Sequence, residues 1–347
     1  RSSRASASKK DLIRENPEKL KEACKKKNAT CDVDGFLNLD KRKRELMVKT
    51  EGLKANQNKL GKDQIEEARK IKEEIKQLDP EILEIEKKLN SLLMQFPNIP
   101  FDDVPVGKDD SENVVLRKEG KIQKFTFQPK DYMQIGESLG LIDIERAGKV
   151  AGSRFGYIKN ELAIIEFGLV NLAMDIGRKK GFIPLIPPVM LKEEMARGTG
   201  YFEAGDEKEA YFLPEDKMYL AGTSEQSVVA MHAGEVLQEK DLPLRYISFS
   251  TCFRREAGSY GKDTKGILRV HQFDKVEMVI FSKQEDSDNE HRLLLSIEEE
   301  LMKKLEIPYQ VISICTGDLG RPAAKKYDIE SWLPSENKYR ETHSSSN

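Results

Sequence analysis

Polar or charged side chains alternate with apolar ones along much of two stretches of the chain, residues 246–256 and 268–278. The charged residues that share a side are Arg254 and Glu256 in the first stretch, and Arg269, Lys275 and Glu277 in the second. A period of two residues is typical of β-strands, so each stretch is predicted to form a strand with one polar face. The Gly- and Lys-rich segment 258–266 between them is predicted to be a loop. Two charged strand faces joined by such a loop predict a pocket for an anionic ligand.

The common phosphate-binding motifs are missing from the sequence. Gly261-Lys262 has Glu256 where a P-loop needs its first glycine, and Asp263 occupies the position of the P-loop hydroxyl. Gly198-Thr199-Gly200 is not followed by the third glycine of a dinucleotide fingerprint. We therefore expect a nucleotide to be held by a sheet and not by a helix N-terminus.

Four segments, taken together, resemble the seryl-tRNA synthetases, a family of class II aminoacyl-tRNA synthetases. Residues 252–261 and 269–277 resemble class II motif 2 in its seryl-specific form, and residues 222–225 (Gly-Thr-Ser-Glu) resemble the family's Thr-x-Glu loop. The predicted strand at 181–188 is similar to motif 1, and residues 327–341 match the stretch that leads to the last ATP contacts. The resemblance extends over nearly the whole chain.

The resemblance implies a serine–tRNA ligase that works in two steps. L-Serine and ATP would form seryl adenylate, and the seryl group would move to the 3′ end of tRNA(Ser), with tRNA(Sec) as a further substrate. Such catalysis consists of positioning and electrostatic stabilisation, without a protein nucleophile. The implied catalytic residues are Arg254, Glu256 and Glu277. The planar guanidinium of Arg254 could bond the serine carboxylate and the α-phosphate together.

The same resemblance implies the nucleotide contacts, with ATP and Mg²⁺ as cofactors. The implied ATP-binding residues are Arg254, Arg255, Glu256, Val270, Phe273, Glu341, Thr342, His343 and Ser344. Glu256 would accept from the adenine amino group and Phe273 would stack on the adenine ring. Glu341 and Ser344 would hold Mg²⁺, a cation that prefers oxygen ligands.

Serine recognition is implied at the Thr-x-Glu loop and at the end of motif 2. The implied serine-binding residues are Thr223, Ser224, Glu225, Arg254 and Glu277. Thr223 and Glu225 would take the ammonium group, and Glu277 would take the hydroxyl. A buried Glu277 without a hydroxyl partner would make alanine or glycine costly to bind.

Two other functions stay open: a catalytically inactive synthetase paralogue that binds tRNA, and an amino-acid:carrier-protein ligase on the same fold. Taken singly, an Arg/Glu pair is typical of a surface ion pair and Phe273 is typical of a core residue. The four segments in the family's order favour ligand contacts instead. The long N-terminal arm described next argues against a carrier-protein ligase, which needs no grip on tRNA.

The sequence pattern of the elements that must position these residues changes near residue 100. Before it, leucines recur every seven residues from Leu39 to Leu60, and a second apolar series with spacings of three and four runs from Ile65 to Leu92. Such heptad patterns predict two helices that fold back at residues 58–62 as an antiparallel coiled-coil hairpin. Pro80 is expected to bend the second helix or to start a new one.

The first helix of this hairpin is basic, with seven Lys or Arg and two Glu residues between positions 41 and 60. One interpretation is the solvated face of a coiled coil, and the other is an arm that grips a phosphate backbone. The resemblance implies the second, an arm for the variable arm and elbow of serine tRNA. The candidate tRNA-binding residues are Lys41, Arg42, Lys43, Arg44, Lys49 and Lys54.

Composition bounds the rest of the prediction. The 347 residues include 58 basic and 60 acidic ones, so a globally cationic nucleic-acid coat is excluded. The fold class is predicted to be α+β, with an N-terminal tRNA-binding domain at 1–104 and a class II catalytic domain at 105–347. This domain is expected to contain a mostly antiparallel β-sheet flanked by helices. A homodimer through the strand at 181–188 is expected, and no uninterrupted apolar run is long enough for a membrane span.

Cysteine usage and the end of the sequence lead to two further expectations. Cys24, Cys31, Cys252 and Cys315 form no Cys-x-x-Cys pair, so reduced thiols and a cytoplasmic location are expected. The sequence ends at Asn347, before the family's motif 3, and the hairpin tip is shorter than the resemblance implies. We therefore expect the natural protein to be longer than the sequence given.

Overall fold

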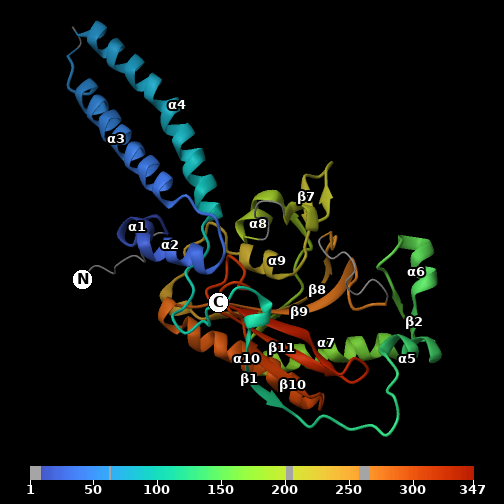
Figure 1. Ribbon diagram of the computed structural model, residues 1–347. Helices are drawn as coiled ribbons and strands as arrows, with labels where there is room; N and C mark the ends of the chain where they lie inside the picture. The colour runs from blue at the N-terminus through green and yellow to red at the C-terminus, as the bar shows by residue number, and fades with distance from the viewer. Residues whose placement is uncertain (1–8, 62–63, 201–205, 258–265) are drawn as a thin grey trace.

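The computed structural model describes residues 9–61, 64–200, 206–257 and 266–347. Figure 1 shows a long two-helix arm that projects away from a body of sheets and helices. The predicted loop 258–266 lies outside the described residues, apart from Gly266. In the part of the chain that is described, no helix is both long and apolar enough to cross a membrane.

The N-terminal region is wholly helical, as the heptads predict. Its helices are α1 (Lys9–Glu15), α2 (Pro17–Lys26), α3 (Val33–Gln57) and α4 (Ile65–Gln95). α3 starts where the side chain of Asp32 accepts a hydrogen bond from the Gly35 amide at 2.8 Å. α3 and α4 form the predicted antiparallel hairpin, and α4 continues through Pro80, so no new helix starts there.

The seam between α3 and α4 is buried only near the body. Leu46, Ile85 and Leu89 are buried together with Phe36, whereas Ile65 at the outer end of α4 is 73% exposed. The apolar cluster at the root, which also includes α1 and α2, therefore anchors the arm, and the outer half stands free in solvent.

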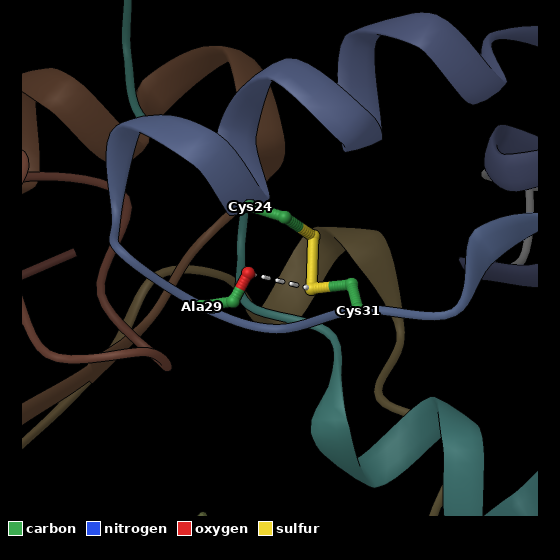
Figure 2. The surroundings of a disulfide bond; sticks show 3 residues. All are labelled: Cys24, Ala29 and Cys31. Carbon is green, nitrogen blue, oxygen red and sulfur yellow. Dashed lines mark hydrogen bonds between the residues drawn. A yellow bond between two sulfur atoms is a disulfide. The ribbon is translucent and has the colours of Figure 1, made fainter.

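Two of the four cysteines contradict the prediction of reduced thiols. Cys24 at the end of α2 and Cys31 before α3 form a disulfide, with Cα atoms 6.3 Å apart (Figure 2). The chain turns back between them at Asn28, which has a φ of 52°, and this turn brings together cysteines whose spacing matches no short motif. Cys252 and Cys315 are free, as expected, and both are buried.

The segment enclosed by the disulfide docks on the body. The Lys27 ammonium group donates to the carbonyl oxygens of Gly320 at 2.9 Å, Arg321 at 3.1 Å and Ala323 at 2.5 Å. The side chain of Lys27 is buried, although lysine is normally exposed. This contact ties the root of the arm to the loop of the body between β10 (Tyr309–Ser313) and β11 (Lys326–Leu333).

The body contains two main sheets. The first has the order β1-β10-β11-β12 and is antiparallel throughout, and the second has the order β4-β8-β9. Their strands are β1 (Val114–Glu119), β4 (Ile183–Leu185), β8 (Leu244–Phe253), β9 (Gln272–Phe281), β10 (Tyr309–Ser313), β11 (Lys326–Leu333) and β12 (Lys338–Ser346). A small sheet β5-β7-β6 comprises Met190–Lys192, Met218–Leu220 and Phe212–Leu213, and β2 (Ile142–Asp143) pairs with β3 (Tyr157–Ile158).

Helices flank these sheets, which confirms the α+β prediction. They are α5 (Tyr132–Ser138), α6 (Ile144–Ala151), α7 (Glu161–Lys179), α8 (Glu193–Gly198), α9 (Glu225–Ala230) and α10 (Ser287–Lys304). The helix expected over 160–180 is α7. Buried residues of α7, β8 and α10, among them Ile176, Ile247 and Ile297, form one core beneath the β4-β8-β9 sheet.

Three strand predictions need correction at their ends. β8 stops at Phe253 and not at 256, because the chain turns off at Glu256, whose φ of 52° is left-handed. β9 starts at Gln272 and not at 268, although the Arg254 amide still donates to the His271 carbonyl at 3.0 Å. The strand expected over 181–188 is only Ile183–Leu185, parallel to β8, since the prolines that follow cannot donate to a ladder.

Candidate active site

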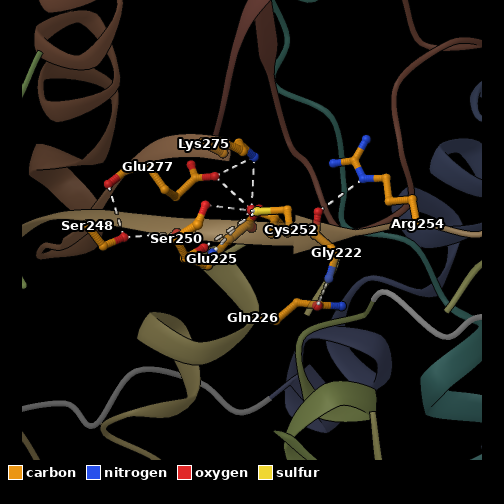
Figure 3. Close-up of polar contacts among 11 residues, drawn as sticks. Gly222, Glu225, Gln226, Ser248, Ser250, Cys252, Arg254, Lys275 and Glu277 are labelled. Carbon is orange, nitrogen blue, oxygen red and sulfur yellow. Dashed lines mark hydrogen bonds and ion pairs between the residues drawn. The ribbon is translucent and has the colours of Figure 1, made fainter. Parts of the chain in front are cut away.

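The paired strands β8 and β9 form the floor of the candidate site. They are antiparallel, and the register sets Ser248 opposite Glu277 and Cys252 opposite Phe273. Because side chains alternate across a strand, Phe273, Lys275 and Glu277 lie on one face of β9. The loop 222–225 before α9 crosses this face, and Figure 3 shows its contacts with both strands.

Three side chains converge where that loop meets β9. The fully buried Thr223 donates its hydroxyl hydrogen to Oε2 of Glu277 at 2.7 Å, and Nζ of Lys275 lies 2.5 Å from the same oxygen. Oγ1 of Thr223 accepts from Nζ of Lys275 at 2.8 Å and from the Glu225 amide at 3.2 Å. The predicted serine-binding residues Thr223, Glu225 and Glu277 are thus brought together.

Ser224 joins the same loop to β8. Its hydroxyl is buried and hydrogen-bonds with that of Ser248 at 2.9 Å, so it fastens the loop to β8. The loop is also held at Gly222, whose amide donates to Oε1 of Gln226 at 3.0 Å. Ser224 therefore holds the loop on the sheet face that carries Glu277, since Ser248 is paired directly with Glu277.

Arg254 lies just past the end of β8, beside this loop. Its Nε donates to the Gly222 carbonyl at 3.0 Å, and its guanidinium carbon is 5.1 Å from the centre of the Phe273 ring. Among the described residues, no group accepts a hydrogen bond from its two Nη nitrogens. One edge of the guanidinium is therefore fixed and the other is available to an anionic ligand.

The other motif 2 candidates have different surroundings. Oε2 of Glu256 accepts from Arg269 at 2.7 Å, and the Arg255 guanidinium lies 5.6 Å from the ring centre of Tyr211. Val270 precedes β9 and is partly buried. Glu256 and Arg269 thus form an ion pair between the ends of β8 and β9, in which the carboxylate is only 14% exposed.

The predicted metal ligands lie on the neighbouring sheet, where a bulge determines which side chains share a face. Ser344 pairs with Asp328, and Glu341 pairs with Glu330. Asp328 and Glu330 are two residues apart on β11, so all four side chains lie on one face. Glu341 and Ser344 are three residues apart, so they would lie on opposite faces of a regular strand. The bulge opposite Ile329 and Glu330 adds one residue to β12 and places both side chains on the same face.

The same bulge separates His343 and Thr342 from that face. His343 pairs with Ile329, which is fully buried, and burial lowers the pKa of His343 to about 4. The Thr342 hydroxyl interacts with the Ser331 hydroxyl at 2.8 Å. These two candidates therefore lie apart from Glu341 and Ser344.

Carboxyl groups dominate the electrostatics between the two sheets. Loss of hydration, with a smaller contribution from Asp328, raises the pKa of Glu341, while Arg254 acts to lower it. Glu298 on α10 is buried, and desolvation together with the charges of Glu277 and Asp328 raises its pKa to about 8. This acidic environment suits a cation or the ammonium group of a ligand.

The sequence interpretation missed Lys275 and Asp328. Lys275 stands in the period-two pattern between Phe273 and Glu277, and this pattern was the available signal. Asp328 lies within the matched segment 327–341, but its importance comes from its pairing with Ser344. Neither residue could be assigned without the register of the strands.

Four of the six basic candidates on the arm form ion pairs. Arg42 contacts Glu81 at 2.8 Å, Lys43 contacts Glu86 at 2.8 Å, and Lys49 contacts Glu74 at 2.7 Å, all across to α4. Arg44 contacts Asp40 on its own helix at 3.1 Å. The exposed Lys41 and Lys54 form no ion pair within the described residues.

Known proteins match both regions of the chain. Residues 10–100 match the seryl-tRNA synthetase N-terminal domain, and residues 212–347 match the class II tRNA synthetase core domain (G, H, P, S and T). The serine–tRNA ligase of Thermodesulfovibrio yellowstonii is 42% identical over 352 residues, covering 97% of this chain and 83% of that protein.

Solved structures agree with these matches. Seryl-tRNA synthetase from Pyrococcus horikoshii complexed with ATP is 38% identical, with a TM-score of 0.91 over 98% of this chain and 84% of that one. The cytoplasmic serine–tRNA ligase of Naegleria fowleri in complex with AMP is 31% identical, with a TM-score of 0.85 over 96% and 80%. The chain therefore belongs to the seryl-tRNA synthetases, a family of class II aminoacyl-tRNA synthetases.

Proposed function

We propose that this protein activates L-serine with ATP and transfers it to tRNA(Ser), with the serine bound between the 222–225 loop and β9. The observation that carries the proposal is that Thr223, Lys275 and Glu277 converge at one point. Arg254 lies beside them and uses only its Nε for a hydrogen bond among the described residues. Glu225 supplies negative charge for the serine ammonium group. Glu277 accepts the hydroxyl hydrogen, a bond that alanine lacks.

For the nucleotide, Arg254 and Phe273 carry the proposal. The ring of Phe273 stacks on adenine, and the free edge of Arg254 bonds the serine carboxylate and the α-phosphate oxygen on which charge grows. Glu256, Arg255 and Val270 complete the adenine side in this proposal. For Glu256 to accept from the adenine amino group, its present bond to Arg269 has to be shared or exchanged.

For Mg²⁺, the proposal rests on the type of side chain present, because no three Asp, Glu, His or Cys residues among the described ones lie close enough together to hold a metal ion. Asp328, Glu330, Glu341 and Ser344 provide oxygen atoms on one strand face, and Oδ1 of Asp328 is buried without a partner among the described residues. Glu341 and Ser344 hold the ion in this proposal. When bound with ATP, Mg²⁺ neutralises charge on the phosphates.

The remaining parts of the proposal concern partners. The region 1–104 binds tRNA through the arm, and the region 105–347 carries the catalysis. A homodimer forms through the segment 181–188, and this is supported by Ile183 and Ile186, which are 52% and 83% exposed.

A serine-dependent pyrophosphate exchange assay tests the activation step. We expect exchange into ATP with serine and little with alanine or threonine. Glu277→Ala should lower the preference for serine over alanine in kcat/KM by about 100-fold, because the hydroxyl loses its acceptor. An absence of exchange, together with salt-sensitive tRNA binding, would instead identify an inactive tRNA-binding paralogue.

A further inference from the structure

Lys275 closes a triangle of hydrogen bonds at the candidate serine site. Its ammonium group contacts Oγ1 of Thr223 at 2.8 Å and Oε2 of Glu277 at 2.5 Å, and those two atoms are 2.7 Å apart. Figure 3 shows Lys275 and Glu277 side by side on β9, facing the 222–225 loop. Lys275 thus bonds to two residues that are proposed to bind serine, but the proposal so far gives Lys275 itself no function.

The bonding capacity of Thr223 fixes the direction of each bond. A hydroxyl donates once and accepts twice, whereas an ammonium group only donates. Oγ1 of Thr223 accepts from Lys275 and from the Glu225 amide, so its own hydrogen must point to Glu277. Oε2 of Glu277 then receives two donors, which leaves Oε1 as the oxygen that can accept from an incoming hydroxyl.

We propose that Lys275 is a positioning residue that makes Glu277 selective for a substrate hydroxyl. Because Oε2 already receives hydrogen bonds from Thr223 and from the Lys275 ammonium group, Glu277 offers its other carboxylate oxygen as an acceptor. A serine hydroxyl satisfies the free oxygen, and a methyl group leaves it unpaired. This inference rests on the proposed function, since it requires serine to bind at Glu277.

The location of Lys275 favours a role in recognition over one in folding. Its side chain is 33% exposed, while that of Glu277 is 14% exposed, so the lysine reaches into the site from the solvent side and packs in no core. In addition, Lys275 connects the 222–225 loop with β9, two elements that are distant in sequence. This connection lies at the proposed binding site of serine.

The test compares three variants in serine- and alanine-dependent pyrophosphate exchange. Lys275→Met removes both donors and the charge, and Lys275→Arg keeps them. Lys283→Met, which removes a surface ion pair with Glu239 near the end of the same strand, is the matched control. Circular dichroism and thermal melts check folding, and Lys275→Gln replaces Lys275→Met if the latter does not fold.

We expect Lys275→Met to raise the KM for serine about tenfold or more, with the KM for ATP changed less than about twofold. The preference for serine over alanine should fall about tenfold, and Lys275→Arg should recover most of it. Equal increases in both KM values, or an unchanged preference, overturns the role of Lys275 when the wild-type protein is active. A wild-type protein without serine-dependent exchange overturns the proposed function itself, and this inference with it.

Discussion

The arm and the candidate site are both rich in charge, but they use it differently. On the arm, Arg42, Lys43 and Lys49 are matched across the helix seam by glutamates that lie in solvent. In the site, the charges surround a fully buried Thr223, and Arg254 keeps one edge of its guanidinium free among the described residues. Charge alone therefore does not identify a binding residue, whereas charge combined with burial and an unused bonding direction does.

The energetic reason is the difference in solvent. An exposed ion pair contributes roughly 0–1 kcal/mol, because water screens it and competes for it. A buried charged group left without a partner costs several times more. We therefore expect substitutions in the site to have larger effects than substitutions on the arm.

Arg254→Ala should produce the largest effect. Loss of the guanidinium removes the donors to the carboxylate and the α-phosphate, so serine-dependent exchange should fall by about 100- to 1,000-fold. Arg292→Ala, an exposed α10 arginine that contacts Asp288, is the control and should stay within about twofold of wild type. An Arg254→Ala variant that keeps full exchange would remove this residue from the site.

Glu298→Gln tests how buried acids destabilise the site region. The pKa of Glu298 is raised to about 8, so the folded protein holds a proton that the unfolded chain releases above about pH 4.5. Stability should therefore fall as pH rises from about 4.5 to 8. The neutral variant lacks this dependence and should be more stable than wild type by about 1–3 kcal/mol at pH 8.

Urea unfolding at pH 5 and pH 8 measures this difference. The two proteins should differ less at pH 5, where Glu298 is protonated in the fold and the pH is only slightly above the ordinary pKa of a glutamate in the unfolded chain. If wild type and variant differ equally at both pH values, the effect comes from packing and not from the proton.

Lys27→Met tests the joint between the two regions. The substitution leaves the carbonyls of Gly320, Arg321 and Ala323 without their donor, so it should destabilise the protein by about 1–3 kcal/mol. Lys26→Met, on an exposed lysine that contacts Glu22, is the control and should cost less than about 0.5 kcal/mol. Chemical denaturation of both variants checks the contrast, and equal stabilities would show that the joint does not depend on this contact.

Arm substitutions should have the smallest effects. If the arm grips phosphates, Lys41→Ala and Lys54→Ala should each weaken tRNA binding a few-fold and lower the slope of log affinity against log salt by about one. Arg42→Ala should weaken binding less, because this side chain is already paired with Glu81. Filter binding over a series of salt concentrations measures the tRNA affinity of each variant. A larger loss of affinity for Arg42→Ala than for the two lysine variants would contradict this prediction.

The sequence predicted the arm well because its information is local. Leucines from Leu39 to Leu60 and the series from Ile65 to Leu92 repeat with the period of a helix seam, and α3 and α4 follow from that repeat. The sequence also located motif 2, since Arg254 and Glu277 occur in a long ordered pattern. It extended both motif 2 strands too far, because the alternation of polar and apolar side chains continues beyond the paired residues Phe253 and Gln272.

The sequence by itself therefore determined the elements, the family resemblance and the residue types available for chemistry. Only the tertiary structure decided which of them meet. Lys275 acquires its partners from the crossing of the 222–225 loop over β9, Glu341 and Ser344 share a face because of a bulge, and Cys24 reaches Cys31 through a turn at Asn28. The physical reason is that hydrophobic periodicity is a property of one segment, whereas hydrogen bonds and pKa values depend on groups from several segments at distances of a few ångströms.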